Sequence, residues 1–229
     1  MKQLAVAACV LVLLLGGGIA LAQEAPPRPP QDLHWNESPI WGSWGFNAGL
    51  MFFNSQQFRE IYGNRGMVFY NMNAGLKLVY QLEVLGSIGY GFSEGRGIAP
   101  ESGQKTDEWY KLHYAPASLG LTYRFGYVLD QPVVPYLGVQ GAFAYWMEER
   151  EHSGTKRRGY LYGMFGTAGV MFLLDKLEPR AAGELESSWG INHSYFYYEY
   201  RYSYMDDFGK KDIIDLSSQF HSFGIAFEF

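Results

Sequence analysis

Cysteine is almost missing from this 229-residue chain, and the single copy, Cys9, lies within an apolar N-terminal run. The residues after it can therefore form no disulfide, no thiolate nucleophile and no cysteine-ligated zinc site. Basic residues are few as well. The 18 Lys and Arg against 23 Asp and Glu leave a net charge of −5, which gives no basic surface for nucleic acid. After residue 22 we find neither a hydrophobic run long enough for a membrane helix nor a segment with helical periodicity.

The N-terminal segment has the pattern of a secretory signal. Lys2 supplies the positive start, residues 4–15 are apolar, and Ala20-Leu21-Ala22 is a small-x-small cleavage site. We expect residues 1–22 to be a signal peptide and residues 23–42 to be a Pro-rich periplasmic segment. The stretch "APPRPP" within it predicts an extended polyproline tether.

Aromatic residues and glycine are abundant, at 17% and 28 residues, and much of the chain alternates large apolar with small or polar residues. The last stretch, "SFGIAFEF", is typical: Phe223, Ile225, Phe227 and Phe229 share one face of a strand, because successive side chains point to opposite faces. This alternation predicts eight strands, at residues 43–53, 70–80, 84–92, 113–125, 135–146, 160–174, 182–192 and about 215–229.

In most of these strands the continuous face is large and apolar, and the other face carries Gly, Ala, Ser and Asn. A soluble sandwich would instead expose Lys, Glu and Thr on its second face. Small residues inside and large apolar residues outside favour a barrel closed in lipid. We therefore predict an all-β domain over residues 43–229, an eight-stranded antiparallel up-and-down transmembrane β-barrel.

The connections predict how this barrel is oriented. Short connections alternate with four long polar ones, at residues 54–66, 93–111, 147–159 and 193–212. In bacterial outer-membrane barrels the short turns face the periplasm and the long loops face outside. Eight strands would then place both termini in the periplasm.

Three segments resemble a known family. "PASLGLTYRF" at residues 116–125, "PYLGVQGAFAY" at 135–145 and the terminal "GIAFEF" are similar to the small eight-stranded outer-membrane β-barrels of the OmpA, OmpX and OmpW type. The resemblance implies the outer membrane of a Gram-negative bacterium, with outer membrane lipid and lipopolysaccharide as neighbours. It also implies that Phe223, Ile225, Phe227 and Phe229 form the terminal signal read by the barrel-assembly machinery. It implies no shared catalytic residue.

Three classes of function stay open. The first is a non-enzymatic scaffold whose long loops contact an extracellular or envelope protein partner, since tyrosine is favoured at binding surfaces. The candidate contacts are Tyr195, Tyr197, Tyr198, Tyr200, Tyr202 and Tyr204, although tyrosine also populates the membrane interface. The second is a narrow channel or a carrier of small apolar molecules. Glycines on the inner face could leave room for it, although the default lumen of eight strands is filled by side chains.

The third class is a lipid-modifying enzyme, which would have to use His193-Ser194 or His221-Ser222. Adjacent residues on a strand point to opposite faces, so neither pair predicts a nucleophile with its base. The five histidines have no metal-ligand spacing. We therefore expect no catalytic, metal or cofactor site.

Charged residues with inward parity form the last candidate site. Lys77, Arg124, Glu184, Glu186 and Glu228 all fall in the periplasmic half of the predicted lumen. A lone buried charge costs several kcal/mol, so opposite charges in this narrow space should pair. We expect a salt-bridged network that closes the barrel floor and argues against a through-pore.

Overall fold

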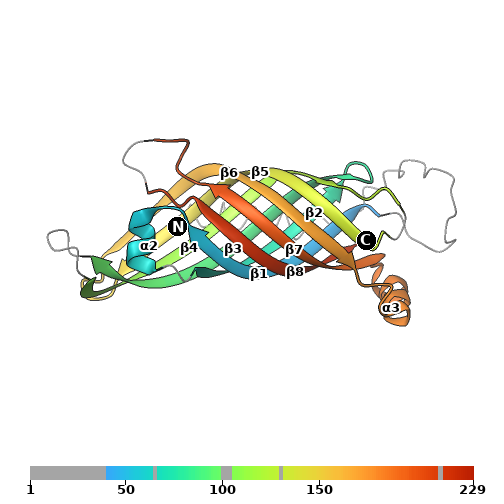
Figure 1. Cartoon of the computed structure of the whole chain (residues 1–229), viewed down its shortest axis with the longest axis horizontal. Helices are drawn as coiled ribbons and strands as arrows, with labels where there is room; N and C mark the ends of the chain where they lie inside the picture. Colours follow the sequence, from blue (N-terminus) through green and yellow to red (C-terminus); the bar gives the residue numbers. More distant parts are fainter. Residues whose placement is uncertain (1–39, 64–65, 99–104, 129–130, 211–213) are drawn as a thin grey trace, which may run out of the picture. The chain divides into compact units, whose positions relative to one another are not determined.

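The computed structural model describes residues 40–63, 66–98, 105–128, 131–210 and 214–229. The predicted signal peptide and most of the Pro-rich segment lie outside these residues. The described chain is an antiparallel barrel with two short helices in its connections (Figure 1). The elements are β1 (Gly42–Phe53), α2 (Gln56–Tyr62), β2 (Met67–Lys77), β3 (Leu82–Ile98), β4 (Lys105–Arg124), β5 (Val133–Arg150), β6 (Lys156–Leu173), α3 (Pro179–Trp189), β7 (His193–Tyr204) and β8 (Ser218–Glu228).

Each strand pairs with its sequence neighbour, and β8 closes the barrel against β1. The closing register pairs Trp44 with Phe227 and Ser43 with Glu228. The chain end extends this seam: the carbonyl of Phe229 accepts hydrogen bonds from the backbone N–H groups of Trp41 and Gly42, at 2.8 and 2.9 Å. Where all eight strands are paired, closure leaves no edge exposed, which is the condition for a sheet to cross a membrane.

The two ends of the barrel differ. Even-numbered strands end and odd-numbered strands begin at one end, together with Phe229; we call it the C-terminal end. We call the other the loop end, because the β1–β2, β3–β4, β5–β6 and β7–β8 connections meet there. Strands β3 to β6 are 17 to 20 residues long, whereas the other four have 11 or 12, so one side of the wall is taller than the other.

The seventh strand expected at residues 182–192 was wrong, because this segment is the helix α3. Ala181, Leu185 and Trp189 follow one another at intervals of four, and Ala182 precedes Leu185 by three, which places these apolar residues on one face of a helix. Pro179 occupies the first turn, where its missing N–H costs nothing. Gly190 ends the helix at φ 68°, a left-handed conformation that glycine adopts without strain.

Strand β7 instead runs through residues 193–204, which we had expected to form the fourth long loop. The long connection of the C-terminal end therefore lies between β6 and β7, and the expected strict alternation of short and long connections was wrong. The helix α2, between β1 and β2, was not expected either. It begins after Ser55 and ends at Gly63, whose N–H donates to the carbonyl of Arg59 at 2.8 Å.

No helix among the described residues is long and apolar enough to cross a membrane.

Candidate functional site

The C-terminal end of the lumen holds a cluster of four charged side chains, all at strand ends. Arg124 contacts Glu228 and lies 2.5 Å from the carboxylate of Glu83. Lys77 lies 2.6 Å from the carboxylate of Glu228. All four side chains are at most 10% exposed. Two positive and two negative charges thus offset one another in a space with little water, which is what makes their burial tolerable.

Hydroxyl groups complete this ionic floor, by which we mean Lys77, Glu83, Arg124, Glu228 and their partners. Ser43 donates to Glu83, and the guanidinium of Arg124 also donates to the Ser43 oxygen at 3.3 Å. The Tyr195 hydroxyl donates to the second oxygen of Glu228 at 3.3 Å. Strands β1, β2, β3, β4, β7 and β8 all contribute, so the floor ties most of the wall together.

Glycine makes room for the floor at one point. A Cβ atom on Gly75 would lie 1.8 Å from a carboxylate oxygen of Glu83, so only glycine lets this side chain cross over β2. At position 75, therefore, the ionic floor can form only because the inner face carries a residue without a side chain.

A second layer of polar side chains lies further along the lumen. The Tyr197 hydroxyl accepts hydrogen bonds from the amide groups of Asn47 and Asn73, at 2.9 and 3.1 Å. On the same strand, Arg201 donates to Glu199 at 2.9 Å, and Tyr136 donates to the other oxygen of Glu199 at 2.9 Å.

The guanidinium of Arg201 also lies over the rings of Phe165 and Phe220, at 5.2 and 5.6 Å from their centroids. Such cation–π contacts stabilise a buried cation. Arg201 therefore joins the polar layer to the apolar side chains beyond it.

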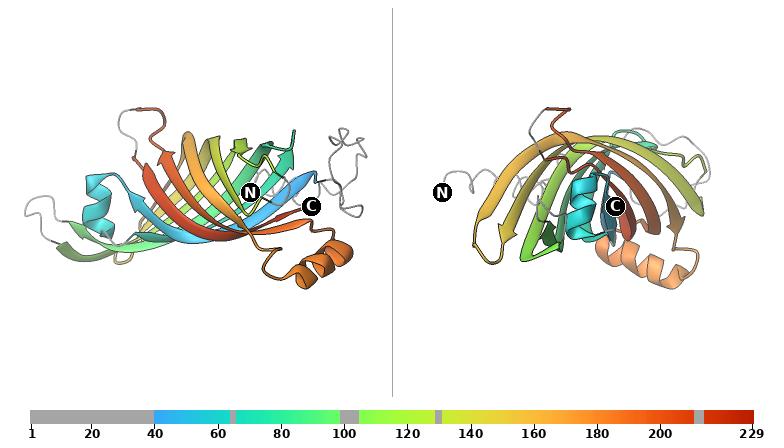
Figure 2. Two further views of the ribbon diagram at one scale, coloured as in Figure 1. Left: turned by 45° about the vertical axis from the view of Figure 1, so that its right-hand side comes forward. Right: turned by 60° about the vertical axis from the view of Figure 1, so that its left-hand side comes forward.

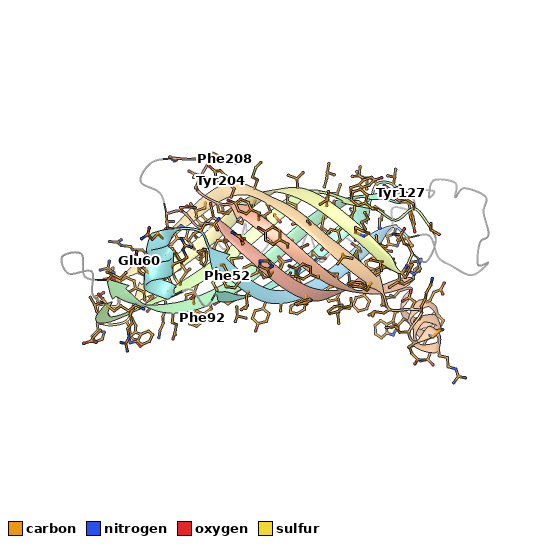
Figure 3. All side chains as sticks on the ribbon, in the orientation of Figure 1. Phe52, Glu60, Phe92, Tyr127, Tyr204 and Phe208 are labelled. Carbon is orange, nitrogen blue, oxygen red and sulfur yellow. The ribbon has the colours of Figure 1, made fainter. Side chains whose placement is uncertain are left out.

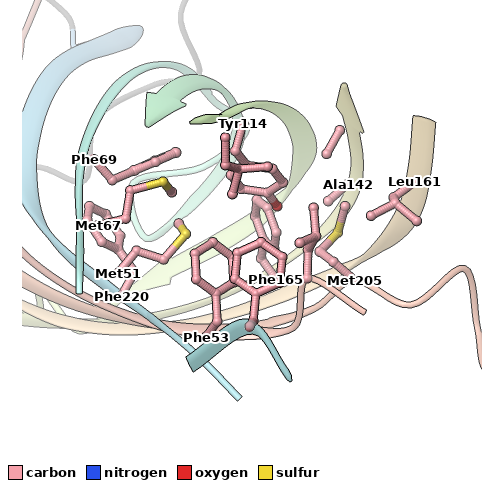
Figure 4. Packing of buried hydrophobic residues seen from close by; sticks show 14 residues of the cluster. Met51, Phe53, Met67, Phe69, Tyr114, Ala142, Leu161, Phe165, Met205 and Phe220 are labelled. Carbon is pink, nitrogen blue, oxygen red and sulfur yellow. The ribbon is translucent and has the colours of Figure 1, made fainter. Parts of the chain in front are cut away.

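Toward the loop end, apolar side chains fill the lumen (Figure 4). Phe69 packs edge-on against Phe220, with centroids 5.0 Å apart, and lies 6.2 Å from the ring of Tyr114. We call this group the apolar core; it contains Met51, Phe53, Phe58, Met67, Phe69, Leu112, Tyr114, Ala142, Ala144, Leu161, Phe165, Met205, Leu216 and Phe220. Its members come from six strands of the wall, β1, β2, β4, β5, β6 and β8, from α2 and from the β7–β8 connection.

The helix α2 covers part of the apolar core. Phe58 packs on Phe53 with centroids 4.5 Å apart and stacks on Tyr62 at 4.6 Å. The Tyr62 hydroxyl donates to Glu148 of β5 at 2.7 Å, which links the β1–β2 connection to the tall side of the wall. Burial, followed by the nearby Glu148 carboxylate, raises the pKa of Tyr62, so the hydroxyl keeps its proton and remains the donor.

A cavity of about 260 Å³ lies beside α2. Its lining combines apolar side chains, among them Met51, Phe58 and Met67, with polar ones such as Asn54 and Arg59.

The structure brings together three of the five residues predicted for the floor: Lys77, Arg124 and Glu228. Glu184 and Glu186 take no part, because they belong to α3 and not to a strand of the wall. The acidic partner that sequence reasoning missed is Glu83, which has the inward parity of Leu85 and Ser87 and stands next to a short turn. Glu199 and Arg201 were missed because their strand was taken for a loop.

The candidate tyrosine contacts also lie in a strand, so the expectation that they occupy a loop was wrong. Tyr195 and Tyr197 point into the lumen and are buried. Tyr198, Tyr200, Tyr202 and Tyr204 have the opposite parity and lie on the outer face of β7. Tyr195 thus belongs to the ionic floor and Tyr197 to the polar layer, while the other four tyrosines belong to the outer surface of the barrel.

The terminal residues lie as predicted from their period of two. Phe223 and Ile225 are exposed on the outer face, whereas Glu228 is buried inside. Phe227 stacks on Trp44 with centroids 6.1 Å apart, and Phe229 packs edge-on against Trp41 at 4.9 Å. Recognition of this strand by the assembly machinery stays a prediction.

The outer face of the barrel is apolar over a broad band. Leu119, Leu121, Leu137 and Val139 are among the exposed large hydrophobic residues, and Figure 3 shows Phe52 and Phe92 on the outside of the wall. On β4 the band runs from His113 to Tyr123, about 33 Å along a strand at ~3.3 Å per residue, or ~25 Å across a membrane for a tilt of ~40°. This height is that of the apolar band of outer-membrane barrels.

A row of alternating charges bounds this band at the loop end. The register sets Glu94 opposite Lys111, Lys111 opposite Glu149, and Glu149 opposite Lys156. Lys156 lies 3.1 Å from Glu149. Just inside this row, Tyr90 bonds to His113 at 2.7 Å, and on the shorter side Tyr198 bonds to His221 at 2.8 Å. Amphipathic rings of this kind are typical of a membrane interface.

The two His-Ser pairs show no shared nucleophile and base. His221 is exposed on the outer face while Ser222 is buried inside, as the parity predicts. His193 bonds to Asp175 at 2.8 Å, and the same carboxylate accepts the backbone N–H of Ser194. In the part of the chain that the structure describes, no cluster of His, Cys, Asp and Glu could hold a metal ion.

The closed barrel, its filled lumen and its apolar outer face define the class: the fold is that of the small eight-stranded outer-membrane β-barrels, as the resemblance implied. Among solved structures the chain is similar to the outer membrane protein OprG from Pseudomonas aeruginosa, with a TM-score of 0.51, 11% identity and coverage of 83% of this chain and 94% of that one.

It is also similar to the Neisserial surface protein A, with a TM-score of 0.48, 16% identity and coverage of 83% and 97%. A further match is Ail of Yersinia pestis, solved in complex with the heparin analogue sucrose octasulfate, with a TM-score of 0.47, 10% identity and coverage of 83% and 97%. At these identities the likeness concerns the fold. No family model and no curated protein matches the sequence.

Proposed function

We propose that this chain is a rigid, non-conducting, non-enzymatic outer-membrane scaffold that holds its loop-end connections at the cell surface for contact with a partner. The observation that carries the proposal is the lumen, which is filled at two separate levels. The ionic floor lies at the C-terminal end, and the apolar core lies at the loop end, with a polar layer between them.

The ionic floor and the apolar core lie one after the other along the lumen, so an ion would have to pass both. An ion would have to displace the paired carboxylates of Glu83 and Glu228 and then cross the apolar core around Phe69 and Phe220. Transfer of an unpaired charge into such an apolar environment costs several kcal/mol or more. Opening one level alone should therefore leave the barrel closed.

Conductance in planar bilayers tests this. The native protein should give no steady conductance, and neither should the double variant Arg124→Ala with Glu83→Ala, since the apolar core remains. Adding Phe69→Ala and Phe220→Ala to that variant should produce channel openings. Steady conductance from the native protein would reject the closed scaffold in favour of a channel.

Labelling of intact cells tests the orientation. The tip of the β5–β6 hairpin, around Ser153, is exposed, and we place it outside the cell. A cysteine introduced as Ser153→Cys should react with a membrane-impermeant maleimide on intact cells. The matched variant Ser187→Cys, in α3 at the opposite end, should react only after the outer membrane is permeabilised. The reverse pattern would overturn the proposed display of the loop end.

The cavity beside α2 favours a second candidate, a carrier for small apolar molecules. The apolar side chains in its lining, such as Phe58 and Met67, could hold such a molecule at the mouth of the barrel without a path through it. An apolar fluorescent probe should then bind the reconstituted protein, and Phe58→Ala should change its affinity severalfold, whereas Phe92→Ala on the outer face should not. Equal binding by all three proteins would mean that the probe reports the lipid surface and not the cavity.

A further inference from the structure

The helix α3 has a two-sided surface that the barrel does not use. One face carries Ala181, Ala182, Leu185 and Trp189, while Arg180, Glu184 and Ser187 lie on the other. A helix with a narrow apolar stripe packs that stripe against something. None of the residues of α3 is buried, although Ala182, Leu185 and Glu186 are partly covered.

Two large apolar side chains of this region are strongly exposed. Trp189 at the end of α3 and Leu177 just before its start are each 78% exposed. By area, an apolar side chain moved fully out of water gains about 1.5–3 kcal/mol, so two such residues at the ends of one helix indicate a surface that they are placed to meet. Tryptophan, like tyrosine, is also enriched at the membrane–water interface.

The position of α3 on the barrel identifies that surface. The helix is held between Leu173, the end of β6, and His193, the start of β7. The nearest outward side chains on these strands are Phe172 and Phe196, both exposed on the apolar band. The apolar face of α3 thus continues a surface whose occupant is lipid.

The direction of α3 also agrees with a contact to lipid. In Figure 1 the barrel axis is horizontal and α3 is seen nearly end-on beside the C-terminal end; in both views of Figure 2 it is seen from the side. The helix therefore lies across the long axis of the barrel. It projects beyond the wall and does not cover the opening (Figure 2). A membrane around the apolar band would run parallel to it.

We propose that α3 is an interfacial helix whose apolar face, Ala181, Ala182, Leu185 and Trp189, lies in the headgroup region of the membrane leaflet at the C-terminal end. In the orientation proposed above this is the periplasmic leaflet. Its polar face remains in water. Amphipathic helices bind membrane surfaces in this way, through buried apolar area and through attraction of basic residues to anionic lipid.

Charge contributes little to this contact. The helix and its approach carry Lys176 and Arg180 against four acidic residues, Asp175, Glu178, Glu184 and Glu186. A net negative segment is not attracted to anionic lipid, so burial of the apolar face has to supply the binding. The contact would fix the depth of the barrel at this leaflet. The inference rests on the membrane location of the barrel, but not on whether the lumen conducts or the loops bind a partner.

Spin labels on the two faces of α3 test the proposal. In the full chain with Cys9→Ser, a nitroxide is attached at Ala181→Cys on the apolar face or at Ser187→Cys on the polar face. Both positions are exposed and small, so neither label should disturb the barrel. Leu119→Cys on the apolar band and Ser153→Cys at the loop tip provide the lipid and water references.

The protein is reconstituted in vesicles of phosphatidylethanolamine and phosphatidylglycerol, and collision of each label with oxygen and with a water-soluble nickel complex is measured. The ratio of oxygen to nickel collisions at Ala181→Cys should be severalfold higher than at Ser187→Cys and should approach that at Leu119→Cys. A ratio at Ala181→Cys equal to that at Ser153→Cys would overturn the proposal.

Two further measurements separate the alternatives. Quenching of intrinsic fluorescence by lipids brominated close to the headgroup should fall in Trp189→Phe; unchanged quenching would count against an interfacial Trp189. Protection of the Ala181→Cys label in native envelopes but not in pure lipid vesicles would show that a protein covers this face, and would reject the lipid contact. The conductance and intact-cell labelling described above can fail without affecting either result.

Discussion

The two ends of the lumen are closed by opposite kinds of chemistry. At the C-terminal end, Lys77, Glu83, Arg124 and Glu228 meet as two positive and two negative charges. At the loop end, the apolar core around Phe69 and Phe220 fills the same narrow cross-section with hydrocarbon. The ionic floor depends on each partner, because a charge left alone keeps its desolvation cost. The apolar core depends on volume, and one partner can in part replace another.

The largest effect should come from removing the central cation. In Arg124→Met, Glu228 keeps its ion pair with Lys77 but Glu83 loses its cation, so the free energy of unfolding should fall by about 4 kcal/mol. Urea unfolding in lipid vesicles measures this. The loss should shrink at acid pH, where protonation neutralises the unpaired carboxylate. Glu184→Gln in α3 is the control, and its free energy of unfolding should stay within about 0.5 kcal/mol of the native value. A loss equal to that of Arg124→Met would mean that Glu184 belongs to the ionic floor after all.

Creating a cavity in the apolar core should cause the next largest loss of stability. Leu161 is fully buried, and Leu161→Ala should lower the free energy of unfolding by about 3 kcal/mol through lost contacts and the space left behind. The same urea titration should give this loss at neutral and acid pH alike, because no ionisable group is exposed. A pH-dependent loss for Leu161→Ala would show that the two ends do not differ as described.

A steric test of the floor should have a smaller effect. In Gly75→Ala the new Cβ would displace the Glu83 carboxylate, and crowding of this kind costs about 1–3 kcal/mol. The matched variant is Gly166→Ala in β6, where a Cβ would meet no atom within 4 Å, and which should change stability by no more than about 0.5 kcal/mol. Equal losses in unfolding experiments would mean that strand conformation, and not Glu83, requires glycine at position 75.

The smallest effect is expected at α2, which covers part of the apolar core at the loop end. Tyr62→Phe removes the hydrogen bond to Glu148, a contribution of about 1 kcal/mol that should loosen α2 and leave the barrel intact. Because the folded-state pKa of Tyr62 is raised, the bond is fully present below the ordinary tyrosine pKa of about 10 and weakens as the pH rises toward the folded value.

Amide hydrogen exchange measures the opening of α2 against the wall. In Tyr62→Phe, exchange in residues 56–62 should become severalfold faster while β4 and β5 keep their protection. Unchanged exchange in α2 would show that Phe58 alone holds the helix in place.

Residue alternation predicted the fold well where a strand has one apolar face. In β8 the alternation of Phe223 and Ile225 with Gly224 and Ala226 predicted both the strand and its faces. It failed between residues 182 and 204. There, Leu185 and Trp189 fit a period of two but also one of 3.6, and only Pro179 and Gly190 indicated a helix. Because β7 is rich in tyrosine on both faces, it has no apolar alternation and resembled a loop.

The sequence by itself determined the barrel, its lipid-facing surface and the inward parity of Lys77, Arg124 and Glu228, because a period of two assigns each side chain to a face. The tertiary structure alone decided which of these charges meet. Pairing depends on the register between strands and on where each strand begins, and these place Glu83 beside Arg124 and remove Glu184 to a helix. It also decided that the loop end is filled, since Phe69, Phe165 and Phe220 come from strands far apart in the chain and meet only when the barrel closes.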